Sequence, residues 1–269
     1  MARLDDFDWD THTRTWSAFW VHDLERPLAL VTEWGRWDKP AWWCPQLGGV
    51  PLTVGADEIA ASAEDQLATQ AWHGDAFPKF WMDFGPGVIA AGLGGDLHAD
   101  GSTTWFTPGR HAGTALADLR LPELGGVWFD RVQAVTRACV ERFGTRACVG
   151  FTDIGGGLDV AASLRDSQQL LFDCMDQPEQ VDRLAREVTR RWWECYQAQL
   201  ALIQPAGCGT TPWAAIWSPA RCYMLKRPRP RYSHCRCIRS LPMRSWMPSW
   251  MRSTPFMPDG ASIEAVCGH

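Results

Sequence analysis

The sequence predicts an α/β fold over residues 1–225 and a separate tail over residues 226–269. Two observations support this prediction. In the longer part, short apolar runs alternate with helical patterns of roughly 14 to 25 residues, which is typical of parallel βα units. After residue 225 this alternation stops and the composition changes. An open doubly wound sheet and a closed barrel both fit the alternation.

The first elements are inferred from apolar spacing and from their end signals. Aromatic residues recur on a helical spacing between residues 14 and 20, and the short apolar run 28–32 predicts a buried strand. An alanine-rich helix is expected over 57–70, because acidic residues occupy its first turn. Residues 84–90 are apolar but interrupted by Gly and Pro, so we predict a strand that ends in a loop.

The later elements have clearer boundaries. A helix is predicted over 126–143, because its apolar residues share one face and a glycine follows as a stop signal. Residues 147–152 predict a buried strand, and residues 158–175 predict a helix. Pro178 fits the first turn of a long amphipathic helix. A fourth strand is predicted over 213–217.

The composition argues against several classes of protein. The 269 residues are 46% hydrophobic, which is enough for a sizeable core. No apolar run is long enough to span a bilayer and the N-terminus is acidic, so we expect a cytoplasmic protein with no membrane partner. A net charge of −5 argues against a nucleic-acid partner.

The ten cysteines are scattered and none forms a CxxC pair. In a reducing compartment cysteine behaves as a small hydrophobic residue. We therefore expect burial of the four cysteines that lie within apolar patterns, Cys139, Cys148, Cys174 and Cys195.

The tail differs from the rest of the chain in charge and in pattern. Eight basic residues against two acidic ones give it a net charge of +6, whereas the preceding part has 18 basic and 29 acidic residues, a net charge of −11. The run Arg227-Pro228-Arg229-Pro230-Arg231 favours neither helix nor strand. The sequence therefore indicates that residues 226–269 do not continue the fold.

A codon argument suggests an origin for the tail. Trp and Met each have one codon, so the coding sequence of Trp246–Thr254 can be inferred in part. Read in a shifted frame, this segment can give Asp-Ala-φ-φ-Asp-Ala-φ-X, where φ is an apolar residue and X is His, Asn, Asp or Tyr. That string has an amphipathic pattern, whereas the written one has none. We hypothesise a frameshift near residue 225, which an uninterrupted reading frame in independent isolates would contradict.

The densest group of chemically active side chains lies in residues 72–87, where His73, Asp75 and Asp83 occur among aromatic residues and glycines. A His/Asp group in a loop can act as an acid–base pair, a metal site or a substrate clamp. The alternative is a loop with a capped, hydrogen-bonded histidine. We take His73 and Asp75 as candidate catalytic residues and Asp83 as a candidate substrate-binding residue.

A second group follows the predicted strand 147–152. Asp153 stands at the carboxyl end of that strand and is followed by glycines, and in β/α barrels this end is the catalytic face. Asp153 is therefore a candidate catalytic residue, while Asp159 is expected to cap the next helix. Arg165 is a candidate clamp for a substrate carboxylate, or else a surface arginine paired with Asp166 or another neighbour.

A third group follows the predicted strand 213–217. Trp217 begins it and is a candidate substrate-binding residue, although packing is the common role of tryptophan. In the tail, His234-Cys235-Arg236-Cys237 imitates a metal motif but has no partner pair.

Taken together, these groups resemble the uroporphyrinogen decarboxylase superfamily, and in particular its uroporphyrinogen decarboxylase-like branch, sometimes labelled trimethylamine corrinoid proteins. The likeness covers residues 14–225. It is carried by Arg26-Pro27-Leu28, His73-Gly74-Asp75-Ala76-Phe77-Pro78, Asp83-Phe84-Gly85-Pro86-Gly87, Phe151-Thr152-Asp153-Ile154-Gly155-Gly156, Trp217-Ser218-Pro219 and Tyr223-Met224-Leu225.

The resemblance implies an incomplete TIM (β/α)8 barrel, its N-terminal half, with a non-native or disordered C-terminal tail. Members of the superfamily include a cofactor-free tetrapyrrole decarboxylase and zinc-dependent corrinoid or coenzyme M methyltransferases. Zinc or a corrinoid is thus the cofactor expected in intact relatives, and a small molecule or a corrinoid protein is the expected partner.

This chain departs from the family pattern at several points. It lacks the arginine-rich N-terminal motif that binds substrate propionates, and Ala220 replaces a glycine that is common in the branch. A later Tyr-His-Leu-Asp-Gly segment is absent, as is the part that supplies the methyltransferases' His and Cys zinc ligands. No metal ligand is therefore assigned.

We expect the intact relative to be a carboxy-lyase or a corrinoid-linked methyltransferase, and this chain to be a truncated, inactive form of it. A sugar-cleaving barrel is a second enzyme class that fits the seventeen tryptophans and the carboxylates. A non-enzymatic remnant and a basic-tailed binding module are further alternatives.

Overall fold

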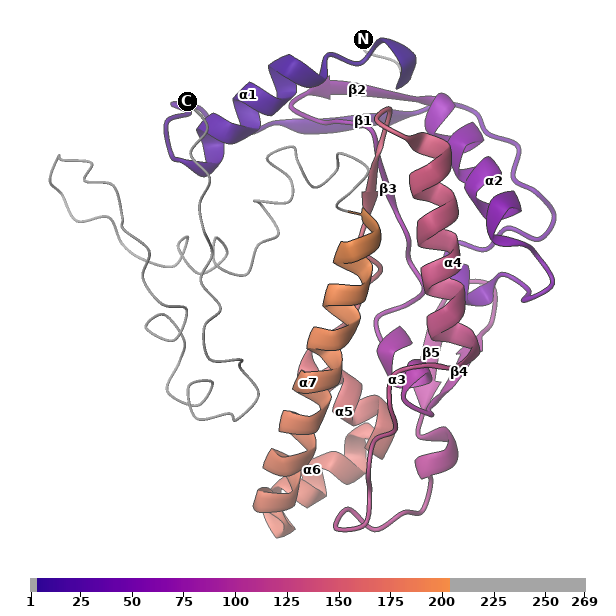
Figure 1. Cartoon of the computed structure of the whole chain (residues 1–269), viewed down its shortest axis with the longest axis vertical. Coiled ribbons are helices and arrows are strands. Elements are labelled where there is room, and N and C mark those ends of the chain that lie inside the picture. The colour runs from indigo at the N-terminus through magenta and orange to yellow at the C-terminus, as the bar shows by residue number, and fades with distance from the viewer. Residues whose placement is uncertain (1–3, 204–269) are drawn as a thin grey trace, which may run out of the picture. The chain divides into compact units, whose positions relative to one another are not determined.

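The computed structural model of the chain describes residues 4–203, all of which belong to the unit Met1–Leu225 (Figure 1). The predicted strand 213–217, Trp217 and the tail 226–269 lie outside the described residues. The hypotheses of a frameshift and of a non-native tail therefore stay predictions.

The described part mixes helices with short strands. Its α-helices are α1 (Trp9–Trp20), α2 (Ala56–Ala68), α3 (Val88–Gly92), α4 (Gly126–Phe143), α5 (Gly157–Arg165), α6 (Ser167–Asp176) and α7 (Pro178–Ile203). Its strands are β1 (Leu30–Trp34), β2 (Gln70–Gly74), β3 (Lys79–Trp81), β4 (Asp96–Ala99), β5 (Thr104–Thr107) and β6 (Cys148–Gly150). Single 3-10 turns occur at Leu4–Asp6, Leu47–Gly49 and Gly109–His111.

Within the described residues these strands form three two-stranded sheets. β1 pairs antiparallel with β2, and β4 pairs antiparallel with β5. β3 and β6 are parallel, with Trp81 opposite Gly150, and the chain between them includes α4. A parallel pair needs such a crossover, and a helix is the usual one.

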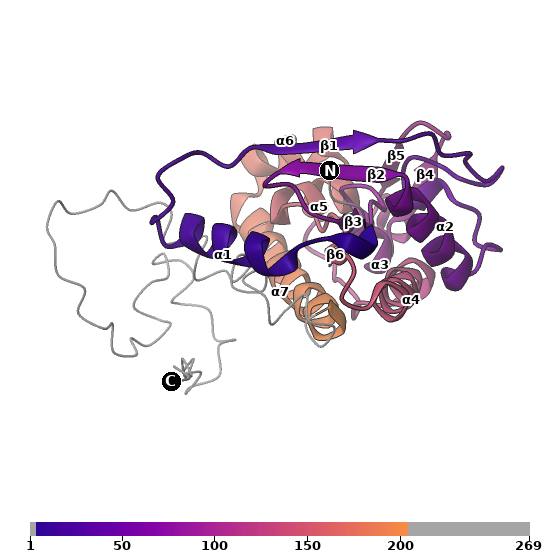
Figure 2. The same ribbon diagram turned by 90° about the horizontal axis from the view of Figure 1, so that it is seen from above.

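Helices α2 and α4 pack against this parallel pair, α2 on β3 and α4 on β6. α2 and α4 contact each other, and α4 also contacts α7. Figure 2 shows β3 and β6 between the β1–β2 sheet and the helices α4 and α7. One buried core includes Met82, Phe84 and Phe143, and a second includes Leu164 and Leu184.

Several predicted elements are confirmed. α2 and α4 match the helices predicted over 57–70 and 126–143, and β6 lies inside the predicted strand 147–152. Gly144 ends α4 with a φ of +55°, a left-handed conformation that favours glycine. The long helix begins at Pro178, as predicted.

The strand predicted over 84–90 is wrong. Gly85 has a φ of +91° and makes a turn, and the apolar run after Pro86 becomes the short helix α3. A short apolar run does not by itself distinguish a strand from a buried helix. The true strand, β3, comes just before this segment.

The prediction of a buried strand over 28–32 is also wrong. β1 is shifted to Leu30–Trp34, all five of its residues are exposed, and it pairs antiparallel rather than parallel. An apolar run predicts burial only if a second layer covers it, and β1 is exposed along its whole length.

The single helix predicted over 158–175 is two helices, α5 and α6. Asp166 breaks it, because this residue has a φ of +75° and accepts hydrogen bonds from the N–H groups of Gln168 and Gln169. A left-handed residue stops one helix, and an aspartate side chain caps the next. No helix in the described range 4–203 is long and apolar enough to cross a membrane.

Candidate functional site

Two aspartates follow the neighbouring parallel strands at the same edge. Asp83 comes just after β3, and Asp153 comes just after β6. Each carboxylate oxygen Oδ1 accepts a hydrogen bond, at 2.8 Å, from the backbone N–H of the glycine two residues later, Gly85 or Gly155. Both segments are therefore Asx turns that fix the carboxylate on its own backbone. We call residues 83–87 and 153–156 the rim loops.

The two rim loops contact each other. Gly155 has a φ of +63° and lies against the carbonyl oxygen of Pro86, where a methyl group would overlap that oxygen. Glycine is thus required at this position for both its conformation and its size.

Helix α7 holds the second rim loop in place. The indole N–H of Trp192 donates to the carbonyl oxygen of Gly155 at 2.9 Å. Phe151 stacks on Tyr196 with 5.1 Å between the ring centroids. The aromatic residues of α7 therefore set the position of the segment that carries Asp153.

Asp83 also lines a cleft of about 510 Å³. Side chains alternate between the two faces of a strand, and this alternation builds the wall that the β1–β2 sheet supplies. On the β1–β2 sheet, Thr32 lies opposite Trp72 and Trp34 lies opposite Gln70, and all four line the cleft. All three residues of β3, Lys79, Phe80 and Trp81, also line the cleft, and Asp83 follows them along the chain.

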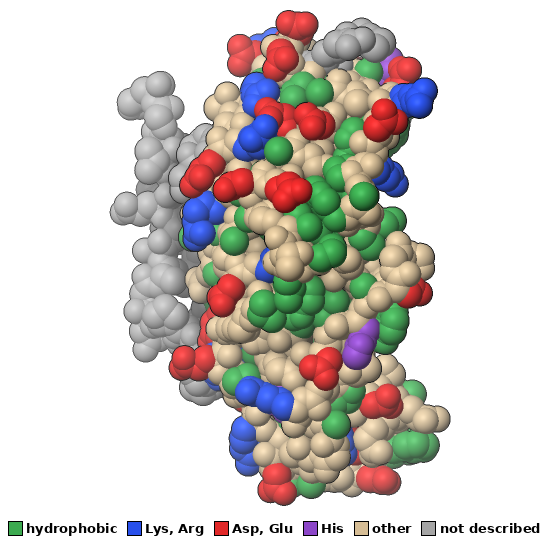
Figure 3. All heavy atoms as spheres, turned by 90° about the vertical axis from the view of Figure 1, so that its right-hand side faces the viewer, with side chains coloured by type: hydrophobic (Ala, Val, Ile, Leu, Met, Phe, Trp, Pro, Cys, Tyr) green, Lys and Arg blue, Asp and Glu red, His purple; other side chains and the backbone are tan. Residues whose placement is uncertain are grey.

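The segment between β1 and α2 supplies the remaining wall, which includes Lys39 and Trp43. Trp34 and Trp81 are 63% and 52% exposed, unusually high values for tryptophan. Figure 3 shows hydrophobic side chains gathered across the middle of one face of the molecule.

His73 does not line this cleft. It lies on β2 between Trp72 and Gly74, so its side chain leaves the opposite face of the sheet. There its Nε2 atom lies 3.0 Å from Oε2 of Glu33, and both side chains are exposed. The structure thus separates His73 from Asp83 and Asp153.

Asp75 is buried and its carboxylate is fully engaged. Arg26 donates two hydrogen bonds to it, at 2.6 and 2.7 Å, and the backbone N–H of Ala29 donates a third at 2.8 Å. The hydrogen bonds from Arg26 hold the pKa of Asp75 below its ordinary value, although burial opposes them. The indole of Trp16 donates to the backbone carbonyl of Asp75. This arrangement ties α1 and the start of β1 to the end of β2.

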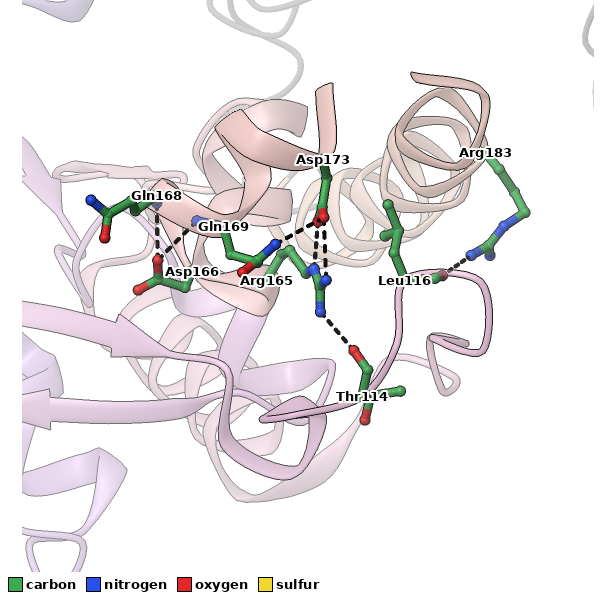
Figure 4. A network of polar contacts seen from close by, with 8 residues as sticks. All are labelled: Thr114, Leu116, Arg165, Asp166, Gln168, Gln169, Asp173 and Arg183. Atoms are coloured by element: carbon green, nitrogen blue, oxygen red, sulfur yellow. Dashed lines mark hydrogen bonds and ion pairs between the residues drawn. The ribbon is translucent and has the colours of Figure 1, made fainter. Parts of the chain in front are cut away.

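Arg165 is committed to an internal contact and does not point to the rim loops. Its Nε atom lies 2.5 Å from Asp173, and its Nη1 atom donates to the carbonyl of Thr114 at 2.6 Å (Figure 4). Arg165 and Asp173 are only 12% and 3% exposed. Its partner is thus Asp173 of α6 rather than the adjacent Asp166. A smaller cavity of about 320 Å³ lies beside Arg165 and His111.

Asp159 has the structural role that the sequence favours. Its carboxylate accepts a hydrogen bond from the backbone N–H of Gly156 at 3.1 Å, which caps α5. Among residues 4–203, no group of three or more His, Cys, Asp or Glu is placed to hold a metal ion. The described residues therefore do not fit the zinc site of the methyltransferases.

Sequence reasoning assigned no role to the two lysines of the cleft. The chain has three lysines in total, and Lys39 and Lys79 are the two that precede residue 226. Both stand beside proline among aromatic residues, in Lys39-Pro40-Ala41-Trp42-Trp43 and Pro78-Lys79-Phe80-Trp81. The signal in the sequence was that the few lysines stand within tryptophan-rich segments.

Comparisons of the chain with protein-family models, with curated proteins and with solved structures find no match.

Proposed function

We propose that residues 1–225 are the N-terminal part of an α/β-barrel enzyme of the uroporphyrinogen decarboxylase-like type, with its active site at the rim loops. One observation carries the proposal: two neighbouring parallel strands each lead into an Asp–X–Gly turn that holds a carboxylate at the same edge. The carboxyl ends of parallel strands are where α/β barrels place catalytic residues. That the strands of this chain belong to a barrel is itself part of the proposal.

In the proposed site, Asp153 and Asp83 exchange protons with the substrate or accept hydrogen bonds from it. One oxygen of Asp153 is held by Gly155, and among the described residues the other has no hydrogen-bond partner. It is therefore available to a ligand, as a general acid or base requires. The full engagement of Asp75 supports a positioning role for that residue in place of a catalytic one.

The proposed reaction is that of a carboxy-lyase or a corrinoid-linked methyltransferase acting on a small molecule in the cytosol. The free cysteines among the described residues support that compartment. No step is assigned to a zinc ion held by residues 4–203, because these residues offer no ligand set for it.

The test compares the chain as written with a version in which the reading frame after Leu225 is restored. Both are assayed for CO2 release from small carboxylates and for methyl transfer from methylcobalamin. We expect turnover in the restored protein alone. There, Asp153→Asn and Asp83→Asn should each lower kcat by about 100-fold or more, because acid–base groups contribute on this scale.

Asp100→Asn is the matched control, since Asp100 makes an equivalent Asx turn with Ser102 in the β4–β5 hairpin but belongs to neither rim loop and does not line the cleft. Its kcat should be unchanged. Hydrolysis of glycosides without decarboxylation or methyl transfer would favour the sugar-cleaving alternative, which the tryptophan-lined cleft keeps open. If the restored protein shows no decarboxylation, methyl transfer or glycoside hydrolysis, the non-enzymatic alternative is favoured.

A further inference from the structure

We propose that the cleft beside Asp83 binds a planar monoanion, namely an aromatic carboxylate of one or two rings. This inference rests on the proposed function, because the cleft and the rim loops share Asp83. It specifies the class of substrate that the rim carboxylates would meet.

The walls of the cleft suit a flat aromatic molecule. All four tryptophans of the lining come from different segments of the chain: Trp34 from β1, Trp43 from the segment between β1 and α2, Trp72 from β2 and Trp81 from β3. Trp72 is buried, whereas Trp34 and Trp81 leave about half or more of their surface exposed. Covering exposed indole surface with a stacked ring removes apolar area from water and adds favourable aromatic contacts.

The charges of the cleft select an anion. Lys39 and Lys79 line it, and neither has an acidic partner within ion-pair distance among the described residues. Asp83 is the acidic residue of the lining, and its two carboxylate oxygens already accept hydrogen bonds from Gly85 and Gln46. Two ammonium groups and one carboxylate leave a net charge of +1, which one carboxylate of a ligand would neutralise.

The location of these lysines strengthens the inference. Residues 4–203 have a large excess of acidic side chains, and their only two lysines both line this cleft. Lysines that served only to keep the protein soluble would have no reason to lie together in one cleft. Ammonium groups that border tryptophan faces can bind a carboxylate while a ring stacks between the indoles.

The size of the cleft is also suitable. About 510 Å³ lies within the range of roughly 300 to 1,000 Å³ that is typical of small-molecule sites. Gln66, Gln70 and Thr32 add polar groups that can orient substituents on a ring.

The test is isothermal titration calorimetry of the full chain with 2-naphthoate, 2-naphthamide and methyl glucoside. The amide has the same rings as the carboxylate but no charge. We expect saturable binding of 2-naphthoate at one site, with the amide at least about tenfold weaker, because hydrogen bonds to a charged group are the stronger ones. Added salt should weaken the binding of the carboxylate but not that of the amide.

Lys39→Gln and Lys79→Gln should each weaken 2-naphthoate binding by about tenfold and leave the amide unchanged. Arg36→Gln is the matched control, because Arg36 is a 92% exposed cation close in sequence that does not line the cleft. Circular dichroism checks that each variant folds. Equal binding of the amide, unchanged binding by both lysine variants, binding of methyl glucoside in place of the carboxylate, or no binding at all would overturn the proposal.

Asp153→Asn separates this inference from the proposed function. Asp153 is absent from the cleft lining, so 2-naphthoate should bind this variant normally even where turnover is lost. If turnover depends on Asp153 but 2-naphthoate fails to bind, the cleft assignment falls and the rim site stands. If 2-naphthoate binds but no turnover depends on Asp153, the rim site falls and the cleft assignment stands.

Discussion

Gly155 packs against the carbonyl oxygen of Pro86, and this contact joins the two rim loops of the candidate site. The first loop follows β3 and carries Asp83, and the second follows β6 and carries Asp153. The pairing of β3 with β6 brings the loops to one edge, and the absence of a side chain at residue 155 lets them touch. The contact between the two rim loops thus depends on one glycine.

Replacing Gly155 should therefore damage both stability and the site. Gly155→Ala would combine an unfavourable left-handed conformation with overlap against Pro86, and we expect it to lower the free energy of unfolding by about 2 to 3 kcal/mol. Gly144→Ala is the control, because Gly144 has a similar φ of +55° but open space around it, and it should cost about 1 kcal/mol. Urea unfolding of both variants measures the difference. Equal costs would show that the loops do not depend on this contact.

The sequence predicted those parts of the fold whose signals are local. The amphipathic pattern and the glycine stop define α4, and the apolar run before Asp153 defines β6, so this aspartate was correctly placed just after a strand. β3 is only three residues long and gives no periodic signal. The apolar residues that follow it were therefore mistaken for the strand.

The candidate cleft depends on pairings that are distant in sequence. Trp34 and Gln70 line it together only because β1 pairs with β2 in one register. A shift of one residue would have exposed His73 to the cleft instead of Trp72. The ion pair of Asp75 with Arg26 is likewise distant in sequence, and the pair of Arg165 with Asp173 forms across the break between α5 and α6. The sequence therefore could not assign these side chains to structural roles.

Arg165 should matter for stability more than for ligand binding. It is paired with Asp173 in a nearly buried position, and removing one member of such a pair leaves the other charge without compensation. We expect Arg165→Gln to lower the free energy of unfolding by about 3 kcal/mol. Arg186→Gln is the matched control, since its pair with Asp182 is an exposed contact within α7 and should contribute less than about 1 kcal/mol. Chemical denaturation distinguishes the two, and similar small losses would contradict the buried pairing.

The buried carboxylates should make the fold sensitive to acid. Hydrogen bonds from Arg26 and Arg165 lower the pKa of Asp75 and of Asp173, respectively, below the ordinary value of 3.8. A carboxyl group with a lowered folded-state pKa stabilises the fold above its unfolded-state pKa, and this contribution is lost as the pH falls through the folded-state value. Stability should therefore decrease steeply below about pH 4.

The variant Asp75→Asn tests this pH dependence. It should be less stable than the wild type at pH 7, and its stability should fall less steeply as the pH decreases below about 4. Thermal melts between neutral and acidic pH measure both effects. Asp100→Asn serves as a comparison, because hydrogen bonds from Ser102 lower the pKa of this fully exposed carboxyl to about 2. If the acid dependence of the Asp75 variant equals that of the wild type, the pair with Arg26 does not contribute to it.

Cysteine reactivity offers a check on the packing of α6 and α7. The expectation that Cys174 is buried is wrong: it is exposed on α6, whereas Cys139 and Cys195 are buried as expected. Burial raises the pKa of Cys139 and of Cys195 to about 12, so neither forms the reactive thiolate at pH 8. Iodoacetamide should modify Cys174 within minutes in the native protein, and should reach Cys139 and Cys195 only after unfolding in urea. Peptide mass mapping measures each site, and rapid native labelling of Cys195 would mean that α7 does not pack against α5 as described.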